Sequence, residues 1–172
     1  MGSLNNKNIN KLILIPTFLY LISIFIGLSL YGYNINILKD NITSLTFLDI
    51  FLNNLKGIGI NILGIFSFGV ITIFYTIFNG LIHGIMIRVF FENFSLLNTL
   101  LKIVPHGIFE VPAIILSCHI GLFPIYIILN KFFNIFCFKK SILLNTLKNL
   151  IFLDILLVFI AAIIESTITK LV

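Results

Sequence analysis

Two histidines and two glutamates in the apolar part of the chain are the residues best suited to chemistry. His106 and Glu110 are four residues apart, so they share one face if that segment is helical. A hydrolytic zinc site uses three nitrogen or oxygen ligands and leaves one position for water. The set therefore predicts a zinc ion held by His83, His106 and Glu165. Glu110 is then the general base, or it exchanges roles with Glu165.

Amides accompany these groups in two neighbouring apolar segments. The first carries a polar or small residue at every fourth position, namely Asp49, Asn53, Gly57 and Asn61, with Asn54 beside this stripe. The second carries Thr72, Thr76, Asn79 and His83, together with the glycine pair Gly80 and Gly84. Residues at this spacing lie on one helix face, and paired glycines let a neighbouring helix approach closely. We expect Asn53, Asn54 and Asn79 to bind the substrate.

Structural explanations compete with the functional one. Charged side chains at the centre of a membrane helix cost about 2.5–3.5 kcal/mol on insertion scales, so such residues are functional hypotheses by default. Neighbouring helices also pair polar groups simply to pack, and a proton- or substrate-conducting path is a third alternative. We interpret Asp154 as structural and His119 as packed or lipid-facing. Ser117 and Cys118 lack a base on their face, so neither is expected to be a nucleophile.

The composition indicates which elements position these residues. Of 172 residues, 59% are hydrophobic and 10% are charged, and the mean hydropathy is +1.17. A soluble domain is about 45–50% apolar and about 25% charged, so this chain has too few charges to cover a soluble surface. Its net charge of +5 comes mostly from scattered lysines without a basic stripe, which argues against nucleic-acid binding.

The sequence predicts an all-α, polytopic membrane helix bundle. A spanning helix needs about 20 mostly apolar residues, and five stretches meet this requirement: 12–30, 45–66, 70–90, 107–129 and 148–169. A tight turn at 67–69 separates the second from the third. Residues 92–104 are amphipathic and are predicted to form an interfacial helix. We expect residues 1–172 to form a single integral membrane domain.

The lysines predict the orientation, because positive charge in short loops is retained on the cytoplasmic side. A cytoplasmic N-terminus places Lys7, Lys11 and the lysines between 131 and 148 inside the cell. We therefore expect a multi-pass protein of the bacterial cytoplasmic membrane with its N-terminus in the cytoplasm. The two histidines and two glutamates then all lie in the outer leaflet. In the opposite orientation these four residues would still lie at one depth, but in the inner leaflet.

Three motifs carry most of these residues. They are NGLIHG at 79–84, PHGIFEVPA at 105–113 and AAIIES at 161–166. With Asn53 or Asn54 as the first element, they resemble the stage II sporulation protein M family over roughly 45–169. His83 departs from the apolar residue that the family pattern has between the two glycines.

The resemblance implies an all-helical integral membrane protein. Sporulation members of the family belong to an engulfment complex with cell-wall hydrolases, and short members are encoded beside head-to-tail circular bacteriocins. For this chain the resemblance implies circular bacteriocin biosynthesis, with a metal-dependent leader peptidase or peptide cyclase acting on a hydrophobic peptide precursor. The alternative is a non-catalytic membrane partner for export with transporter subunits, for immunity or for a cell-wall remodelling complex. The lipid bilayer and a second copy of the chain, forming a homo-oligomer, are further expected partners.

Overall fold

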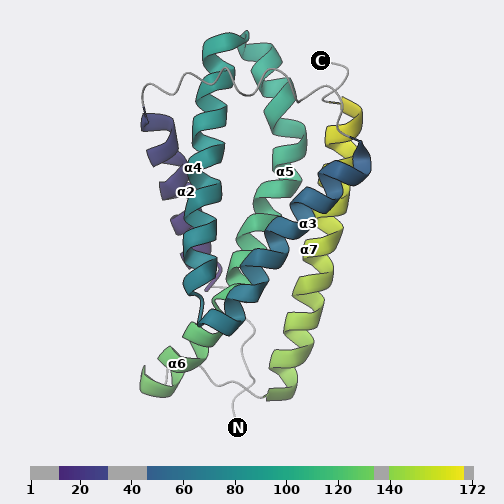
Figure 1. The fold of residues 1–172 in the computed structure, drawn as a ribbon. Helices are drawn as coiled ribbons and strands as arrows, with labels where there is room; N and C mark the ends of the chain where they lie inside the picture. Colours follow the sequence, from purple (N-terminus) through teal and green to yellow (C-terminus); the bar gives the residue numbers. More distant parts are fainter. Residues whose placement is uncertain (1–11, 31–45, 134–139, 169–172) are drawn as a thin grey trace.

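A computed structural model describes residues 12–30, 46–133 and 140–168. A few side chains within these ranges, including that of His106, lie outside the described part. The described part is helical and contains no strand, which confirms the predicted all-α bundle (Figure 1). Its elements are α2 (Leu14–Ser29), α3 (Phe47–Leu63), the 3₁₀ turn η2 (Gly64–Ser67), α4 (Val70–Asn93), α5 (Leu96–Gly121), α6 (Phe123–Phe133) and α7 (Lys140–Ile168).

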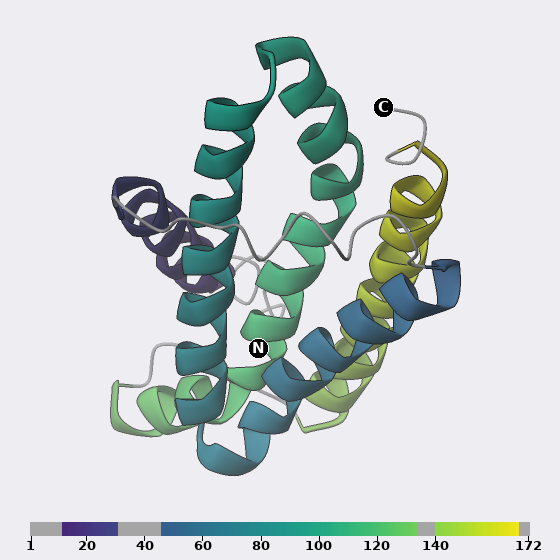
Figure 2. The same ribbon diagram turned by 45° about the horizontal axis from the view of Figure 1, so that its top comes forward.

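Helix α5 lies at the centre of the bundle and contacts α2, α3, α4, α6 and α7. Helices α2 and α4 pack together on one side of α5, whereas α3 and α7 pack together on the other (Figures 1 and 2). Helix α3 crosses α7 obliquely and reaches α5 and α4 toward its C-terminal end (Figure 2). This arrangement directs the polar faces of α3 and α4 toward α5.

Several described helices are long and apolar enough to cross a membrane. They are Phe47–Ser67, Val70–Asn93 and Asn145–Thr167, and the bent pair Leu96–Pro105 and Gly107–Gly121 makes a fourth. Helix α2 is apolar but has 16 residues, or about 24 Å at 1.5 Å per residue, against a hydrocarbon core of about 30 Å. The described part therefore supplies three to four of the five predicted spans, and the span over α2 stays a prediction.

The segment 92–104, which is predicted to be an interfacial helix, has other bounds in the structure and is continuous with the helix that follows. Helix α4 continues to Asn93, and α5 begins at Leu96, where the Ser95 hydroxyl accepts a hydrogen bond from the backbone N–H of Asn98 at 3.4 Å. From there α5 runs on through Pro105 into the predicted fourth span and bends by 46° at that point. A proline inside a helix removes one backbone hydrogen bond and commonly produces such a kink.

Other boundaries also move. Helix α5 ends at Gly121, and the remainder of the span predicted to reach 129 belongs to α6. Helix α7 begins at Lys140, earlier than the predicted start at 148. The predicted turn at 67–69 is confirmed: Phe68 and Gly69 have φ angles of 51° and 81°, a left-handed conformation that glycine adopts at little cost.

Close contact between α2 and α4 confirms the prediction made from Gly80 and Gly84. A Cβ atom added to Gly84 would lie 2.2 Å from the carbonyl oxygen of Ile24, and one on Gly80 would lie 2.5 Å from the Cβ of Ser23. Gly27 of α2 is equally constrained, because its added Cβ would lie 2.3 Å from the carbonyl oxygen of Leu81. Small residues thus bring the two backbones together.

Asn61 organises a buried polar network where α3, α4 and α5 meet. Its Nδ2 donates to Ser117 Oγ at 3.0 Å, and its Oδ1 accepts from the Thr76 hydroxyl at 3.3 Å. Its backbone carbonyl accepts from the Thr72 hydroxyl at 2.7 Å. All four residues are at most 1% exposed. These polar groups satisfy one another, so we assign them a structural role.

The substitution Asn61→Leu is expected to destabilise the bundle by about 1–3 kcal/mol, because it leaves buried hydroxyl groups without their partner. Thermal unfolding in detergent measures the loss. Asn93→Leu is the matched control, since Asn93 is exposed and its amide contacts only the Val89 carbonyl of its own helix. Equal unfolding temperatures for the two variants would contradict the structural role of Asn61.

Candidate functional site

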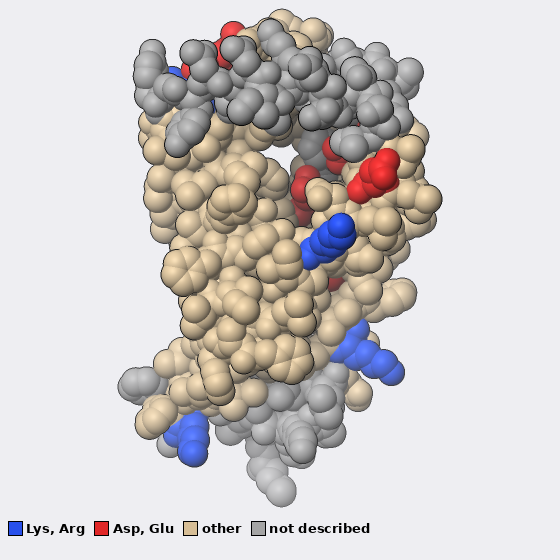
Figure 3. All heavy atoms as spheres, in the orientation of Figure 1, with Lys and Arg blue, Asp and Glu red and all other residues tan. Residues whose placement is uncertain are grey.

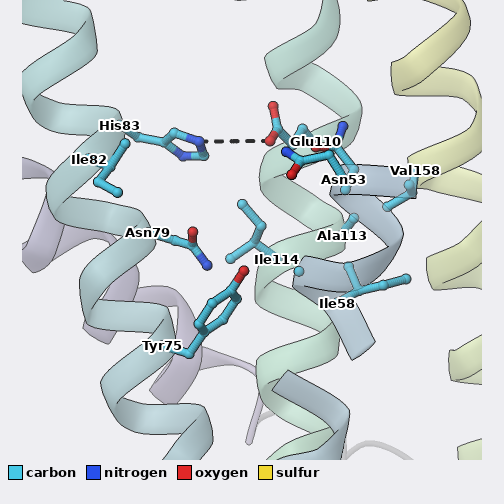
Figure 4. Close-up of a pocket in the computed structure, with 12 residues that line it drawn as sticks. Asn53, Ile58, Tyr75, Asn79, Ile82, His83, Glu110, Ala113, Ile114 and Val158 are labelled. Carbon is cyan, nitrogen blue, oxygen red and sulfur yellow. Dashed lines mark ion pairs between the residues drawn. The ribbon is translucent and has the colours of Figure 1, made fainter. Parts of the chain in front are cut away.

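A cavity of about 260 Å³ lies between α3, α4 and α5 and is bordered by α7. Its polar lining residues are Asn53, Asn54, Tyr75, Asn79, His83 and Glu110, and aliphatic side chains of the same helices complete the wall (Figure 4). The surrounding face of the molecule carries few charged side chains (Figure 3). An opening between the helices is visible there, with acidic side chains beside it (Figure 3). A partly open polar cavity thus lies within an apolar bundle.

His83 and Glu110 face each other across this cavity from α4 and α5 (Figure 4). His83 Nε2 lies 3.7 Å from Glu110 Oε1, and the two side chains are 28% and 19% exposed. This separation is longer than a direct hydrogen bond of about 2.7–3.2 Å, so a small side-chain rotation makes or breaks one. An imidazole and a carboxyl group can each take up or release a proton, so the pair is a candidate for acid–base chemistry.

Tyr20 of α2 holds the other side of the His83 ring. Its hydroxyl contacts His83 Nδ1, and its ring stands edge-on to the imidazole with centroids 6.0 Å apart. Tyr20 is fully buried. Both nitrogens of His83 thus face polar groups, and the contact at Nδ1 determines which proton arrangement Nε2 presents to Glu110.

Tyr20 is not among the residues that the sequence predicts for the site. Its hydroxyl meets His83 across 63 positions of sequence, which no local pattern reveals. One signal was available, since Tyr20, Ser23 and Gly27 recur at helical spacing and are all buried on one face of α2. A tyrosine on the small-residue face of a membrane helix has to place its hydroxyl against a partner in the protein.

Tyr20→Phe is expected to release the His83 ring and to lower any activity of the site about tenfold. A hydrogen bond contributes about 0.5–1.5 kcal/mol, and 1.4 kcal/mol corresponds to a factor of ten. The ¹⁵N NMR signals of His83 report the tautomer directly and should change. Tyr126→Phe is the control, because that buried hydroxyl contacts the Leu12 carbonyl. Unchanged His83 signals in the Tyr20 variant would contradict the assigned contact.

The structure brings five of the seven residues predicted for the site to this one cavity. They are Asn53, Asn54, Asn79, His83 and Glu110. Glu165 is not among the described lining residues but interacts electrostatically with Glu110. The backbone of His106 lies in α5 one turn before Glu110, whereas its side chain is outside the described residues. The roles given to these seven residues stay predictions.

A zinc site would need ligands in addition to His83 and Glu110, the two side chains that face each other across the cavity. Among the residues that the structure describes, no group of three or more His, Cys, Asp or Glu side chains is placed to hold a metal ion. His83 and Glu110 supply two donors, whereas a catalytic zinc ion takes three protein ligands. His106 and Glu165 would have to complete the set.

The remaining titratable residues lie elsewhere in the bundle. His119 is 2% exposed and packs against Tyr126 and Phe123 with ring centroids 5.5 and 6.2 Å apart. Asp154 is fully buried, and neither carboxylate oxygen has a hydrogen-bond partner in the described part of the chain. Cys118 is a buried free thiol, and Cys137 lies outside the described residues. Among the described residues, none of His119, Asp154 and Cys118 lines the cavity.

Comparison with known proteins places the chain in a family. The family model of Stage II sporulation protein M matches residues 15–170. Over 80 residues the chain is 39% identical to "Uncharacterized protein MJ0793" of Methanocaldococcus jannaschii, a match that covers 44% of this chain and 43% of that protein. No solved structure matches the chain. Because the family model covers nearly the whole sequence, this membrane protein belongs to the stage II sporulation protein M family.

Proposed function

We propose that this chain binds a hydrophobic peptide precursor within the membrane during circular bacteriocin biosynthesis. It either cleaves a peptide bond of this precursor, as a leader peptidase, or forms one, as a peptide cyclase. The observation that carries the proposal is the pair of His83 and Glu110, held on the wall of a cavity inside an apolar bundle. Ionisable residues in membrane helices are costly and usually mark functional sites. A polar cavity in this setting suits a substrate that itself resides in the membrane.

The cavity wall offers the groups that a peptide backbone needs. The side chains of Asn53, Asn54 and Asn79 each carry donors and an acceptor, as a peptide bond does. The Nδ2 atom of Asn54 is buried and has no hydrogen-bond partner among the described residues. An unpaired buried donor costs about 1–3 kcal/mol, which a substrate carbonyl group would recover. Ile114 and Val158 complete the wall and suit an aliphatic side chain.

Glu110 is the proposed general base. In a leader peptidase Glu110 takes a proton from water as the water oxygen bonds to the substrate carbonyl carbon, and it returns the proton to the amine nitrogen when the C–N bond breaks. In a peptide cyclase the N-terminal amine is the attacking group. Glu110 takes a proton from this amine as its nitrogen bonds to the C-terminal carboxyl carbon, and it returns the proton to the carboxyl oxygen that leaves as water when the C–O bond breaks. Acid–base catalysis of this kind contributes about 10²–10⁴-fold to a rate. His83 orients Glu110, while Tyr20 contacts the other nitrogen of His83.

Zinc is the cofactor that His83, His106 and Glu165 would hold if they converge, and it would polarise the carbonyl or activate water. Metal analysis of the purified protein tests this proposal against the acid–base account, which expects no stoichiometric metal. Stoichiometric zinc that is lost in His83→Ala and retained in His119→Ala would replace the acid–base account with a metal centre. The retained zinc would also show that the packed His119 is not a ligand.

Photocrosslinking tests the peptide-binding part of the proposal. A photoreactive amino acid at Ile82, which lines the cavity, should capture a co-expressed circular-bacteriocin precursor. The same amino acid at Phe66, which is 83% exposed on the outside of the bundle, should capture little. Equal capture at both positions, or none at Ile82, would contradict binding in the cavity.

The second candidate is a non-catalytic membrane partner for bacteriocin export, immunity or cell-wall remodelling. The network around Asn61 favours it, because polar groups in this bundle do satisfy one another for packing. This function predicts that substitutions in the lysine-containing segment 131–148 abolish partner binding. A cell-wall remodelling role further predicts co-purification with a hydrolase.

The proposed topology is multi-pass in the bacterial cytoplasmic membrane, with a cytoplasmic N-terminus. The uncompensated lysines near the N-terminus and between 131 and 148 support it. Labelling of single cysteines introduced at Asn5 and Ser67 with a membrane-impermeant reagent distinguishes this orientation from its inverse.

A further inference from the structure

We infer that the cavity binds the free α-ammonium group of a peptide N-terminus, with Glu110 as its counter-charge. The inference rests on the proposed function, because it takes the ligand to be a peptide. It goes further by naming the part of the peptide that the cavity holds. Three features of the cavity carry it: its charge, its hydrogen-bonding groups and its size.

The described wall of the cavity carries the Glu110 carboxylate, and the one basic side chain that faces it there, His83, is charged only when protonated. Glu110 lies on the cavity wall and interacts electrostatically with Glu165. No lysine or arginine is among the described residues that line the cavity. Arg88 of α4 is engaged elsewhere, since its guanidinium donates to Glu92 at 2.7 Å and to the Leu28 carbonyl at 3.0 Å. A carboxylate on the wall of a cavity within an apolar bundle favours a bound positive charge.

The hydrogen-bonding groups suit an N-terminal residue better than a simple cation. An ammonium group has three donors, and the Glu110 carboxylate with the side-chain oxygens of Asn53 and Asn79 can accept them. The unpartnered Nδ2 of Asn54 requires an acceptor instead. An N-terminal residue supplies the donors and the acceptor together, because its own carbonyl oxygen lies close to its ammonium group. A metal ion or a simple amine would leave Asn54 unsatisfied.

The size of the cavity favours a chain end. Its volume of about 260 Å³ lies below the range of about 300–1,000 Å³ that is typical of sites for drug-sized ligands. The cavity is therefore suited to the terminal residue of a peptide rather than to a long folded segment of that peptide. A free N-terminus is the product of leader cleavage and the attacking amine of head-to-tail cyclisation, so both proposed reactions present this group to the site.

Binding of matched peptides to the full chain in lipid nanodiscs tests the inference. The probes are a short hydrophobic peptide of leucine and alanine with a free N-terminus, its N-acetylated twin, and an N-acetylated version that contains one lysine. Each carries a fluorophore at its C-terminus for anisotropy measurements. We expect acetylation to weaken binding about tenfold or more, since hydrogen bonds to charged groups are the stronger ones.

Two glutamine variants locate the effect. In Glu110→Gln the difference between the free and acetylated peptides should disappear, because the carboxylate charge is gone. In Glu92→Gln it should persist, because Glu92 is exposed and paired with Arg88 outside the cavity. The wild-type comparison remains decisive even if the Glu110 variant is unstable.

Each other outcome has a defined meaning. Equal binding of the free and acetylated peptides to the wild-type protein would overturn the inference while leaving peptide binding intact. Tight binding of the acetylated lysine peptide would show that any ammonium group suffices, which also overturns recognition of the N-terminus. Binding of none of the three peptides would contradict the proposed function as well.

Discussion

Glu110→Gln is expected to stop maturation of a circular-bacteriocin precursor co-expressed with this chain. Glutamine keeps the shape of the side chain but cannot take up a proton, so the rate should fall by about 10²–10⁴-fold, the usual contribution of a general base. Mass spectrometry of the peptide from producing cells measures the ratio of mature product to precursor. The substitution acts at the only acidic residue among the described residues that line the cavity.

Glu92→Gln is the matched control, because it changes the same residue type at a position of α4 that does not line the cavity. Glu92 is exposed and forms an i,i+4 ion pair with Arg88, and pairs of this type contribute only about 0.3–0.5 kcal/mol. Maturation should therefore continue in this variant. Normal maturation in Glu110→Gln, with the protein present at wild-type levels, would eliminate the catalytic role and favour the non-catalytic partner.

Gly84→Ala is expected to destabilise the protein strongly, because the added methyl group has no space. The new Cβ would lie 2.2 Å from the carbonyl oxygen of Ile24 and 2.9 Å from the Cα of Gly27, which are backbone atoms of α2. Helix α2 would have to move away, and overpacking of this kind typically costs about 1–3 kcal/mol. Tyr20 would move with α2 and lose its contact with His83, so activity should fall together with stability.

Thermal unfolding in detergent compares this variant with Gly59→Ala. Gly59 has open space at the position of its missing Cβ, since in the described part of the chain no atom beyond the neighbouring backbone of its own helix lies within 4 Å. Because alanine also has the higher helix propensity, Gly59→Ala should leave the unfolding temperature unchanged or raise it. Similar unfolding temperatures for the two alanine variants would show that α2 does not pack against α4 as closely as the structure places it.

The sequence predicted the helices well where apolar length alone decides. The turn at 67–69 followed from a stretch about twice too long for one span, and the glycine pair at 80 and 84 predicted a close neighbour. The bounds of the segment 92–104 were not predictable from its amphipathic pattern, and its interfacial position stays a prediction. Only the tertiary structure shows that the Ser95 cap starts a helix that continues through Pro105.

The candidate site was predictable in part, for a similar reason. Spacing by four residues placed Asn53 on the polar face of one helix and Asn79 and His83 on the polar face of the next, and a shared depth linked them to Glu110. Sequence periodicity gives the helix face and the depth of a residue, but it does not show which helices are neighbours in the bundle. The order of the helices puts Tyr20 against His83. It also leaves Glu165 outside the described wall of the cavity.

The proposed activity is tested most directly by incubating a purified circular-bacteriocin precursor with the full chain in lipid nanodiscs and following the peptide mass. We predict that the wild-type protein and Glu92→Gln convert the precursor, either by removing its leader or by closing the ring with loss of one water. Glu110→Gln should leave it intact. A precursor that stays unchanged with the wild-type protein, or that Glu110→Gln converts equally fast, would contradict catalysis by this site.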